Sequence, residues 1–75
     1  MVTADDGMVV FCEVKARASD RYGPAAGAVD ARKQRKLRGL AVRWLSEHPD
    51  LRRFRIRFDV AAVTGAHIQV IESAF

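Results

Sequence analysis

The stretch Met8-Val-Val-Phe-Cys-Glu-Val-Lys-Ala-Arg17 decides the fold of this chain, because its apolar run predicts a β-strand. Side chains alternate between the two faces of a strand, so Glu13 and Lys15 project from the same face. Phe11 and Arg17 lie on that face as well. The opposite face, which we expect to be the core face, carries Val10, Cys12, Val14 and Ala16.

The tripeptide Glu13-Val14-Lys15 resembles half of a nuclease active site. A carboxylate and an ammonium group two residues apart could hold a divalent metal and position the water that it activates for phosphodiester cleavage. Glu-x-Lys also occurs on many solvated strand faces. The tripeptide alone therefore favours an ordinary exposed strand, and the active-site hypothesis needs further support.

Length and composition indicate one small domain, residues 1–75, with 49% hydrophobic residues to form a single core. The lone Cys12 cannot form an intrachain disulfide, and we expect a reduced thiol in a cytoplasmic protein. The first residues do not resemble a signal peptide, and no apolar run approaches the ~20 residues of a membrane span. We therefore expect no contact with a membrane.

Basic residues gather in the stretch from Arg32 to Arg57, which has a net charge of +8 and leaves the rest of the chain near −4. The ten basic residues are Arg32, Lys33, Arg35, Lys36, Arg38, Arg43, Arg52, Arg53, Arg55 and Arg57. Clustered basic charge is typical of a surface that binds a polyanion such as DNA or RNA. The alternative is a solvated helix face in an organism that uses arginine freely.

Turn residues and apolar spacing predict the order of the elements. Asp5-Asp6-Gly7 predicts a hairpin turn between strands over 1–4 and 8–17, with Val2 facing Val10. Helical spacing of apolar residues predicts a helix over about 28–47, which ends at His48-Pro49. Further strands are expected over 54–60 and 67–71. The order indicates an α/β fold: a mixed β-sheet with one main covering helix.

Lys33 differs from the other basic residues of the predicted helix. It lies four residues before Leu37 and four after Val29, so it belongs to the apolar stripe that faces the sheet. Lysines commonly snorkel from the edge of such a stripe. The alternative is a cation aimed at the strand that carries Glu13 and Lys15, where a phosphate would lie.

Several separate segments together resemble the YraN-like family of uncharacterised bacterial proteins. They are Val10-Phe-Cys-Glu-Val-Lys-Ala-Arg17, Tyr22-Gly-Pro24, Val29 with Lys33 and Leu37, Arg57-Phe-Asp-Val60 and Ala74-Phe75. That family looks like a branch of the PD-(D/E)XK nuclease superfamily, which is related to archaeal Holliday-junction resolvases. The resemblance covers nearly the whole chain. It implies a restriction-endonuclease-like fold, with metal-dependent phosphodiester hydrolysis as the ancestral chemistry.

The resemblance also implies roles for individual residues. Glu13 would ligate Mg²⁺ or Mn²⁺, the Val14 backbone carbonyl would be a further ligand, and Lys15 would orient the attacking water or stabilise developing charge. Asp59 matches a late Arg-Phe-Asp segment of the family and has no assigned role. The residues expected to contact DNA or RNA, including branched DNA, are Arg17, Arg32, Lys33, Arg35 and Lys36.

The chain departs from the family pattern at its start. Family members have an N-terminal helix and then a strand similar to Gly-Glu-Ile-Asp, whose Asp is the first metal ligand, and Met1 stands just after that position. We therefore expect a domain that lacks its first helix and is nearly inactive, because it is truncated at the N-terminus, misannotated at its start codon, or degenerate. The bare sheet face predicts a homodimer. Two alternatives stay open: a catalytically inactive remnant that binds nucleic acid, and a small basic interaction domain that meets an acidic protein.

Overall fold

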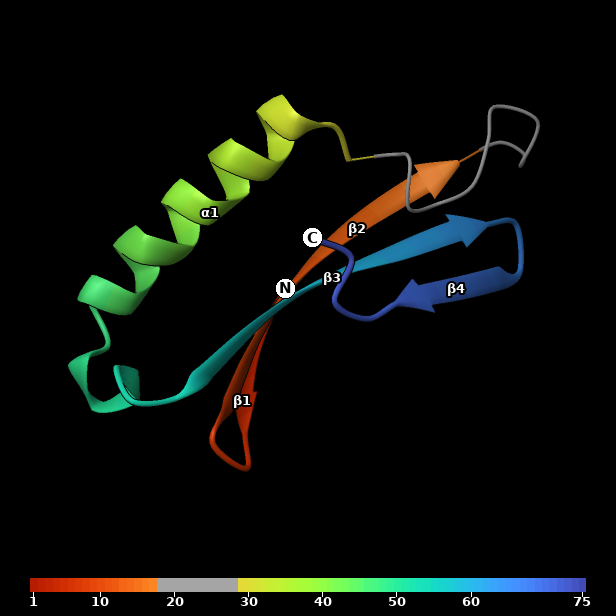
Figure 1. Ribbon diagram of the computed structural model, residues 1–75. Helices are drawn as coiled ribbons and strands as arrows, with labels where there is room; N and C mark the ends of the chain where they lie inside the picture. The colour runs from red at the N-terminus through yellow and green to blue at the C-terminus, as the bar shows by residue number, and fades with distance from the viewer. Residues whose placement is uncertain (18–28) are drawn as a thin grey trace.

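The computed structural model describes residues 1–17 and 29–75, apart from the side chain of Arg17. The elements are β1 (Val2–Asp5), β2 (Met8–Arg17), α1 (Ala31–Ser46), the 3-10 helix η2 (Pro49–Leu51), β3 (Arg55–Thr64) and β4 (His67–Ile71) (Figure 1). This order confirms the predicted succession of strand, strand, helix, strand and strand. The Tyr22-Gly-Pro24 segment lies outside the described residues. Neither described helix is long and apolar enough to span a membrane.

The four strands form one mixed sheet in the order β1-β2-β3-β4. β2 and β3 run parallel, whereas β1 with β2 and β3 with β4 pair antiparallel. A parallel pair cannot be joined by a tight turn, and α1 lies in the connection that returns the chain from β2 to β3. The architecture is therefore α/β, as the sequence predicts, and is consistent with a restriction-endonuclease-like fold.

The hairpin between β1 and β2 has a tighter turn than the sequence suggests. Asp6 and Gly7 have φ values of 48° and 74°, and two consecutive residues with positive φ are typical of the type I′ hairpin turn. Val2 therefore lies opposite Phe11 rather than Val10. The predicted register is wrong by one residue because it places three residues in the turn instead of two.

Helix α1 begins where a side chain can cap it. Asp30 accepts a hydrogen bond at Oδ1 from the backbone N–H of Lys33 at 2.9 Å, which satisfies one of the donors left without a partner at a helix start. The helix consequently starts at Ala31, later than predicted. It ends at Ser46, just before the His48-Pro49 pair expected to stop it.

The core lies between α1 and one face of the sheet. The Phe11 ring of β2 stacks on Phe58 of β3 with the centroids 5.5 Å apart, and Val60 is fully buried. Trp44 of α1 meets the Phe11 ring edge-on at 5.6 Å. Helix α1 therefore covers the face of β2 that carries Phe11.

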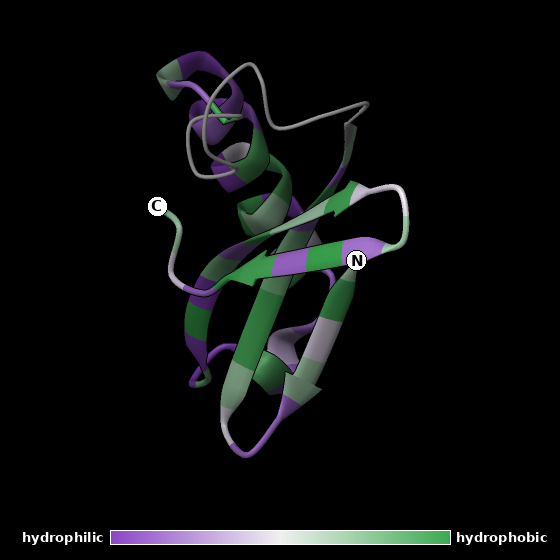
Figure 2. Cartoon of the chain, turned by 90° about the vertical axis from the view of Figure 1, so that its right-hand side faces the viewer, coloured by the Kyte–Doolittle hydropathy of each residue, from purple (hydrophilic) through white to green (hydrophobic). Residues whose placement is uncertain are grey.

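The opposite face of β2, which the sequence predicts to be the core face, is covered by no helix among the described residues. Val14 is 55% exposed there, and Ile68 and Val70 of β4 are 69% and 56% exposed on the same face. Figure 2 looks onto this face, with α1 behind the sheet and many hydrophobic residues along the strands. The prediction is wrong because both faces of β2 are apolar. Alternation separates two such faces but does not identify the one that the helix covers.

Candidate functional site

The candidate site centres on an ion pair between β2 and α1. The Nζ atom of Lys33 lies 2.7 Å from Oε1 of Glu13, and the two side chains are 36% and 23% exposed. Lys33 stands in the first turn of α1, where the Asp30 cap fixes the backbone. Of the two alternatives for Lys33, the structure shows the second, in which its ammonium group points at the strand that carries Glu13. Its part in binding nucleic acid remains a prediction.

Lys15 lies two residues beyond Glu13 on the same face of β2 and is half-buried. Its neighbour on β3 is Ala62, which is buried. Together with Lys33, these side chains bring two ammonium groups and one carboxylate to the α1-covered face. The three residues therefore carry a net charge of +1, which favours an anionic ligand over a cationic one.

The backbone of Val14 lies two residues beyond the last residue of β2 that pairs with the β1 side in the described part of the chain. The β1–β2 ladder extends to Met1, whose N-terminal ammonium donates to the Cys12 carbonyl at 2.9 Å and whose carbonyl accepts from the Cys12 N–H at 2.8 Å. Alternate residues of a strand direct their N–H and C=O groups to the same neighbour. Val14 therefore presents its carbonyl on the β1 side of β2, beyond the last pair that the described residues form. Its side chain points to the uncovered face, away from Glu13.

Asp59 lies on the strand next to Glu13 but not beside it. In the β2–β3 register Cys12 faces Asp59 and Glu13 faces Val60, so the two carboxylates project from opposite faces of the sheet. Asp59 could serve as a second ligand at the Glu13 site only if both side chains shared a face. The structure therefore excludes Asp59 from that site.

Asp59 instead joins β3 to the C-terminal tail. Arg57 donates from Nε to Oδ1 at 2.9 Å and from Nη2 to Oδ2 at 2.8 Å, and the Ser73 backbone N–H donates to Oδ1 at 3.0 Å. Burial alone would raise the pKa of Asp59, but the hydrogen bonds from Arg57 and Ser73 and the attraction to Arg57 outweigh burial and lower it. Asp59 is thus an ionised structural carboxylate, in the ion pair with Arg57 that the alternation of β3 suggests.

The described residues do not fit a divalent cation by themselves. No three His, Cys, Asp or Glu side chains among residues 1–17 and 29–75 come together in a way that could hold a metal ion. Glu13 supplies the sole carboxylate on the α1-covered face of β2 and β3. Mg²⁺ and Mn²⁺ prefer several oxygen ligands, and one carboxylate with one backbone carbonyl is a poor set.

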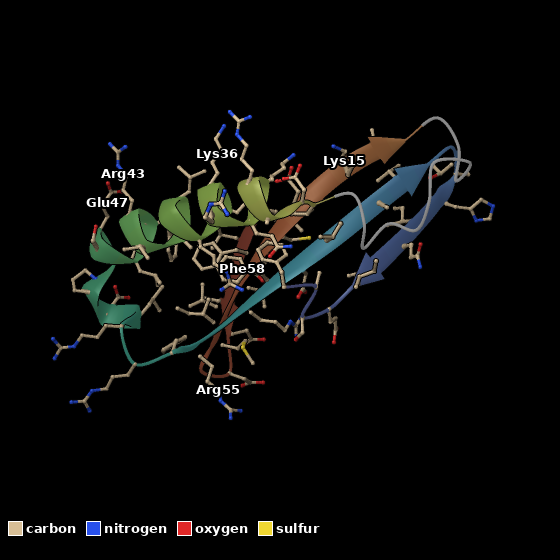
Figure 3. The ribbon with its side chains drawn as sticks, turned by 45° about the horizontal axis from the view of Figure 1, so that its top comes forward. Lys15, Lys36, Arg43, Glu47, Arg55 and Phe58 are labelled. Atoms are coloured by element: carbon tan, nitrogen blue, oxygen red, sulfur yellow. The ribbon has the colours of Figure 1, made fainter. Side chains whose placement is uncertain are left out.

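The basic residues of α1 divide between its exposed and covered faces. Arg32, Arg35 and Lys36 are exposed. Figure 3 shows Lys36 and Arg43 projecting from α1 at the top of the view, whereas Arg55 lies at the bottom. The cluster from Arg32 to Arg57 is therefore not a single patch. The side chain of Arg17 lies outside the described residues, so its expected contact with nucleic acid stays a prediction.

Arg38 has a contact that the charge pattern does not predict. Its guanidinium carbon lies 4.8 Å from the centre of the Phe58 ring and 5.4 Å from that of the Phe75 ring, within the range of a cation–π interaction. The two rings stack on each other at 5.0 Å. The sequence feature that could have revealed this contact is helical spacing. Arg38 lies three residues before Ala41 and seven before Leu45, so it belongs to the same stripe of the helix.

A groove of about 420 Å³ opens beside Glu13, between α1 and the strands β1 and β2. Its walls are mainly apolar and aromatic and include the contacting rings of Phe11 and Trp44 and the half-exposed Leu40. Arg43 and Glu47 stand at its α1 side. The candidate site is thus a polar end of a largely apolar groove.

Comparison with known proteins gives a consistent family. The sequence model described as "Uncharacterised protein family UPF0102" matches residues 1–63. A UPF0102 protein of Frankia casuarinae is 50% identical over 64 residues, which make up 85% of this chain and 53% of that protein. A UPF0102 protein of Halorhodospira halophila is 39% identical over 75 residues, which are 100% of this chain and 59% of that protein. The chain therefore spans little more than half the length of the curated relatives that it matches.

Proposed function

The chain belongs to the uncharacterised protein family UPF0102, the family expected from its resemblance to YraN-like proteins, and we propose that it is a nucleic-acid-binding domain of the endonuclease-like kind. The observation that carries the proposal is the arrangement of Lys33 and Lys15 around Glu13 on one face of β2. Two ammonium groups next to a single carboxylate suit a phosphodiester, which is a singly charged anion.

The exposed side of α1 supports the same ligand. Arg32, Arg35 and Lys36 project into solvent close in sequence to Lys33, so a polyanion approaching the site would meet further positive charge. Contacts of this kind bind nucleic acid without regard to sequence, and each phosphate that they neutralise releases counterions. We propose a cytoplasmic protein that binds DNA or RNA, with branched DNA among the substrates to be tested.

Hydrolysis is a separate matter, because the described residues do not complete a site for Mg²⁺ or Mn²⁺. Glu13 and the Val14 carbonyl are the proposed ligands, and Lys15 is the proposed group for the attacking water or the developing charge. With Asp59 on the other face, the described residues 1–17 and 29–75 supply one carboxylate at this site, where a hard cation needs more. We therefore propose that this chain binds nucleic acid and that cleavage belongs to longer members of the family that add a carboxylate.

Fluorescence anisotropy with labelled duplex, single-stranded and four-way-junction DNA tests the proposal. Binding should be detectable at low salt and should weaken steeply as monovalent salt is raised, because counterion release drives it. Unlabelled DNA should displace the probe far better than an acidic polypeptide does. Undetectable binding at low salt, or an affinity indifferent to salt, would remove nucleic acid as the ligand. Tighter binding to the acidic polypeptide would favour the interaction-domain alternative.

A further inference from the structure

We propose that the Glu13–Lys33 ion pair is an internal latch on a phosphate-binding site. In the free protein Glu13 holds Lys33, and a phosphate of the bound nucleic acid takes the place of the Glu13 carboxylate. Lys33 and Lys15 then form the site. The inference rests on the proposed nucleic-acid function and adds a regulatory element to it, because Glu13 weakens nucleic-acid binding in this chain.

The latch explains how the negative charge of Glu13 is balanced, although the described residues form no site for a divalent cation. The Nζ atom of Lys33, 2.7 Å from Oε1, supplies the positive charge next to this carboxylate. No further His, Cys, Asp or Glu side chain of residues 1–17 and 29–75 joins Glu13 in a metal-binding group. An ammonium group thus compensates Glu13, and Glu13 in turn masks an ammonium group that would otherwise face a phosphate.

A comparison of two ion pairs in the described residues shows which one can open. Asp59 receives a two-pronged contact from Arg57 and a backbone hydrogen bond from Ser73, and its side chain is only 5% exposed. The Glu13–Lys33 pair has a single short contact, and both side chains reach solvent. Partly exposed pairs add little net stability, and the flexible stem of lysine can redirect its ammonium group. Lys33 can therefore exchange Glu13 for a phosphate without disturbing the fold.

The lysines, rather than the start of α1, form the anion site. A helix N-terminus attracts anions through its free N–H groups, but the Asp30 carboxylate already caps this end and adds a negative charge there. Lys15, on the same face as Glu13, provides the second cation. A phosphate between Lys15 and Lys33 would be opposed mainly by Glu13 itself.

Substitutions of the two latch residues should change DNA affinity in opposite directions. Glu13→Gln keeps the shape of the side chain, removes its charge and frees Lys33. In EDTA at 0.1 M monovalent salt it should tighten binding to a labelled duplex about fivefold to tenfold and steepen the slope of log K against log salt by about one. Lys33→Gln should weaken binding by a similar factor and lower the slope by about one.

Matched variants separate the latch from a general effect of charge. Asp50→Asn makes the same charge change as Glu13→Gln on an exposed carboxylate of η2, outside the groove, and it should change affinity by less than about twofold. In a Lys33→Gln background, Glu13→Gln should act no more strongly than Asp50→Asn. Thermal unfolding followed by the fluorescence of Trp44, the one tryptophan of the chain, verifies that each variant is folded. If Lys33→Gln does not fold, Lys33→Met keeps the apolar stem and replaces it.

Each outcome bears on a different statement. If Glu13→Gln behaves like Asp50→Asn, or if its effect persists without Lys33, the latch is wrong while the proposed nucleic-acid binding stands. If the unaltered chain and every variant fail to bind DNA at low salt, the proposed function itself is wrong. Opposite changes in DNA affinity from the two single substitutions, with the Glu13→Gln effect lost in the Lys33→Gln background, support both the latch and the proposed function.

Discussion

Glu13 and Asp59 lie on adjacent parallel strands but on opposite faces of the sheet, because Glu13 faces Val60 and Asp59 faces Cys12 across the β2–β3 ladder. Because Asp59 is paired one residue away from Glu13, the two carboxylates lie on opposite faces and have different roles. Glu13 pairs with Lys33 at the candidate site, and Asp59 ties the C-terminal tail to β3. Stability and binding can therefore be altered separately.

Asp59→Asn should destabilise the domain by about 2 kcal/mol without changing DNA affinity, because charged hydrogen bonds at a buried site are lost. The lowered pKa of Asp59 means that folding favours its ionised form. Its contribution to stability is therefore present above the ordinary value of 3.8 and is lost as pH falls through the lower, folded-state pKa. Unfolding by urea at pH 7 and at pH 3 measures this. The unaltered chain should lose more stability on acidification than Asp59→Asn does, and equal losses would exclude Asp59 as a source of the pH dependence.

Charge on the exposed side of α1 should determine how steeply binding depends on salt. The triple change Arg32→Gln, Arg35→Gln and Lys36→Gln should lower the slope of log K against log salt by about two to three, because each lost phosphate contact removes roughly one unit. A charge-matched control changes Arg52, Arg53 and Arg55, which are exposed and lie between the end of η2 and the first residue of β3. Equal effects of the two triple variants would mean that net charge, rather than this side of α1, determines binding.

The uncovered sheet face should make the 75-residue chain associate. Val14, Ile68 and Val70 are more than half exposed on that face, and contiguous exposed apolar surface promotes self-association. Sedimentation velocity should show a dimer that Val70→Lys converts to a monomer. Val42→Lys is the matched control, since Val42 is 68% exposed on α1. A monomer before any substitution, or dissociation by both changes alike, would argue against association through the sheet.

The sequence predicts those parts of the structure that are determined by residues close together along the chain. Lys33 could be aimed at the Glu13 strand because four-residue steps along α1 fix its side of the helix. The end of α1 followed from Pro49, and the strand β3 from strict alternation. The side of the sheet that α1 covers was not predictable, because Phe11 on one face of β2 and Val10 on the other are both suitable for a core.

The candidate site also depends on long-range register. The face to which Asp59 belongs relative to Glu13 is set by the pairing of β2 with β3, whose strands are separated by α1 in the sequence. Local patterns carry no information about that offset. The contact of Arg38 with Phe75 likewise requires the tail to return to β3, which Ser73 and Ala74 achieve through bonds to Asp59 and to the Phe58 carbonyl.

Cleavage assays on this chain and on a longer UPF0102 protein test most directly the proposal that the 75-residue chain binds nucleic acid without cutting it. The 75-residue chain and the longer UPF0102 protein of Halorhodospira halophila are incubated with duplex, single-stranded and four-way-junction DNA, with Mg²⁺ or Mn²⁺ and with EDTA. The 75-residue chain should bind without cutting. The longer protein should cut only with metal, and substitution of its residues aligned with Glu13 or Lys15 should abolish cutting. Strong EDTA-sensitive cleavage by the 75-residue chain would contradict the proposal that this chain binds without cutting. Cleavage indifferent to Glu13 and Lys15 would contradict the nuclease-like assignment.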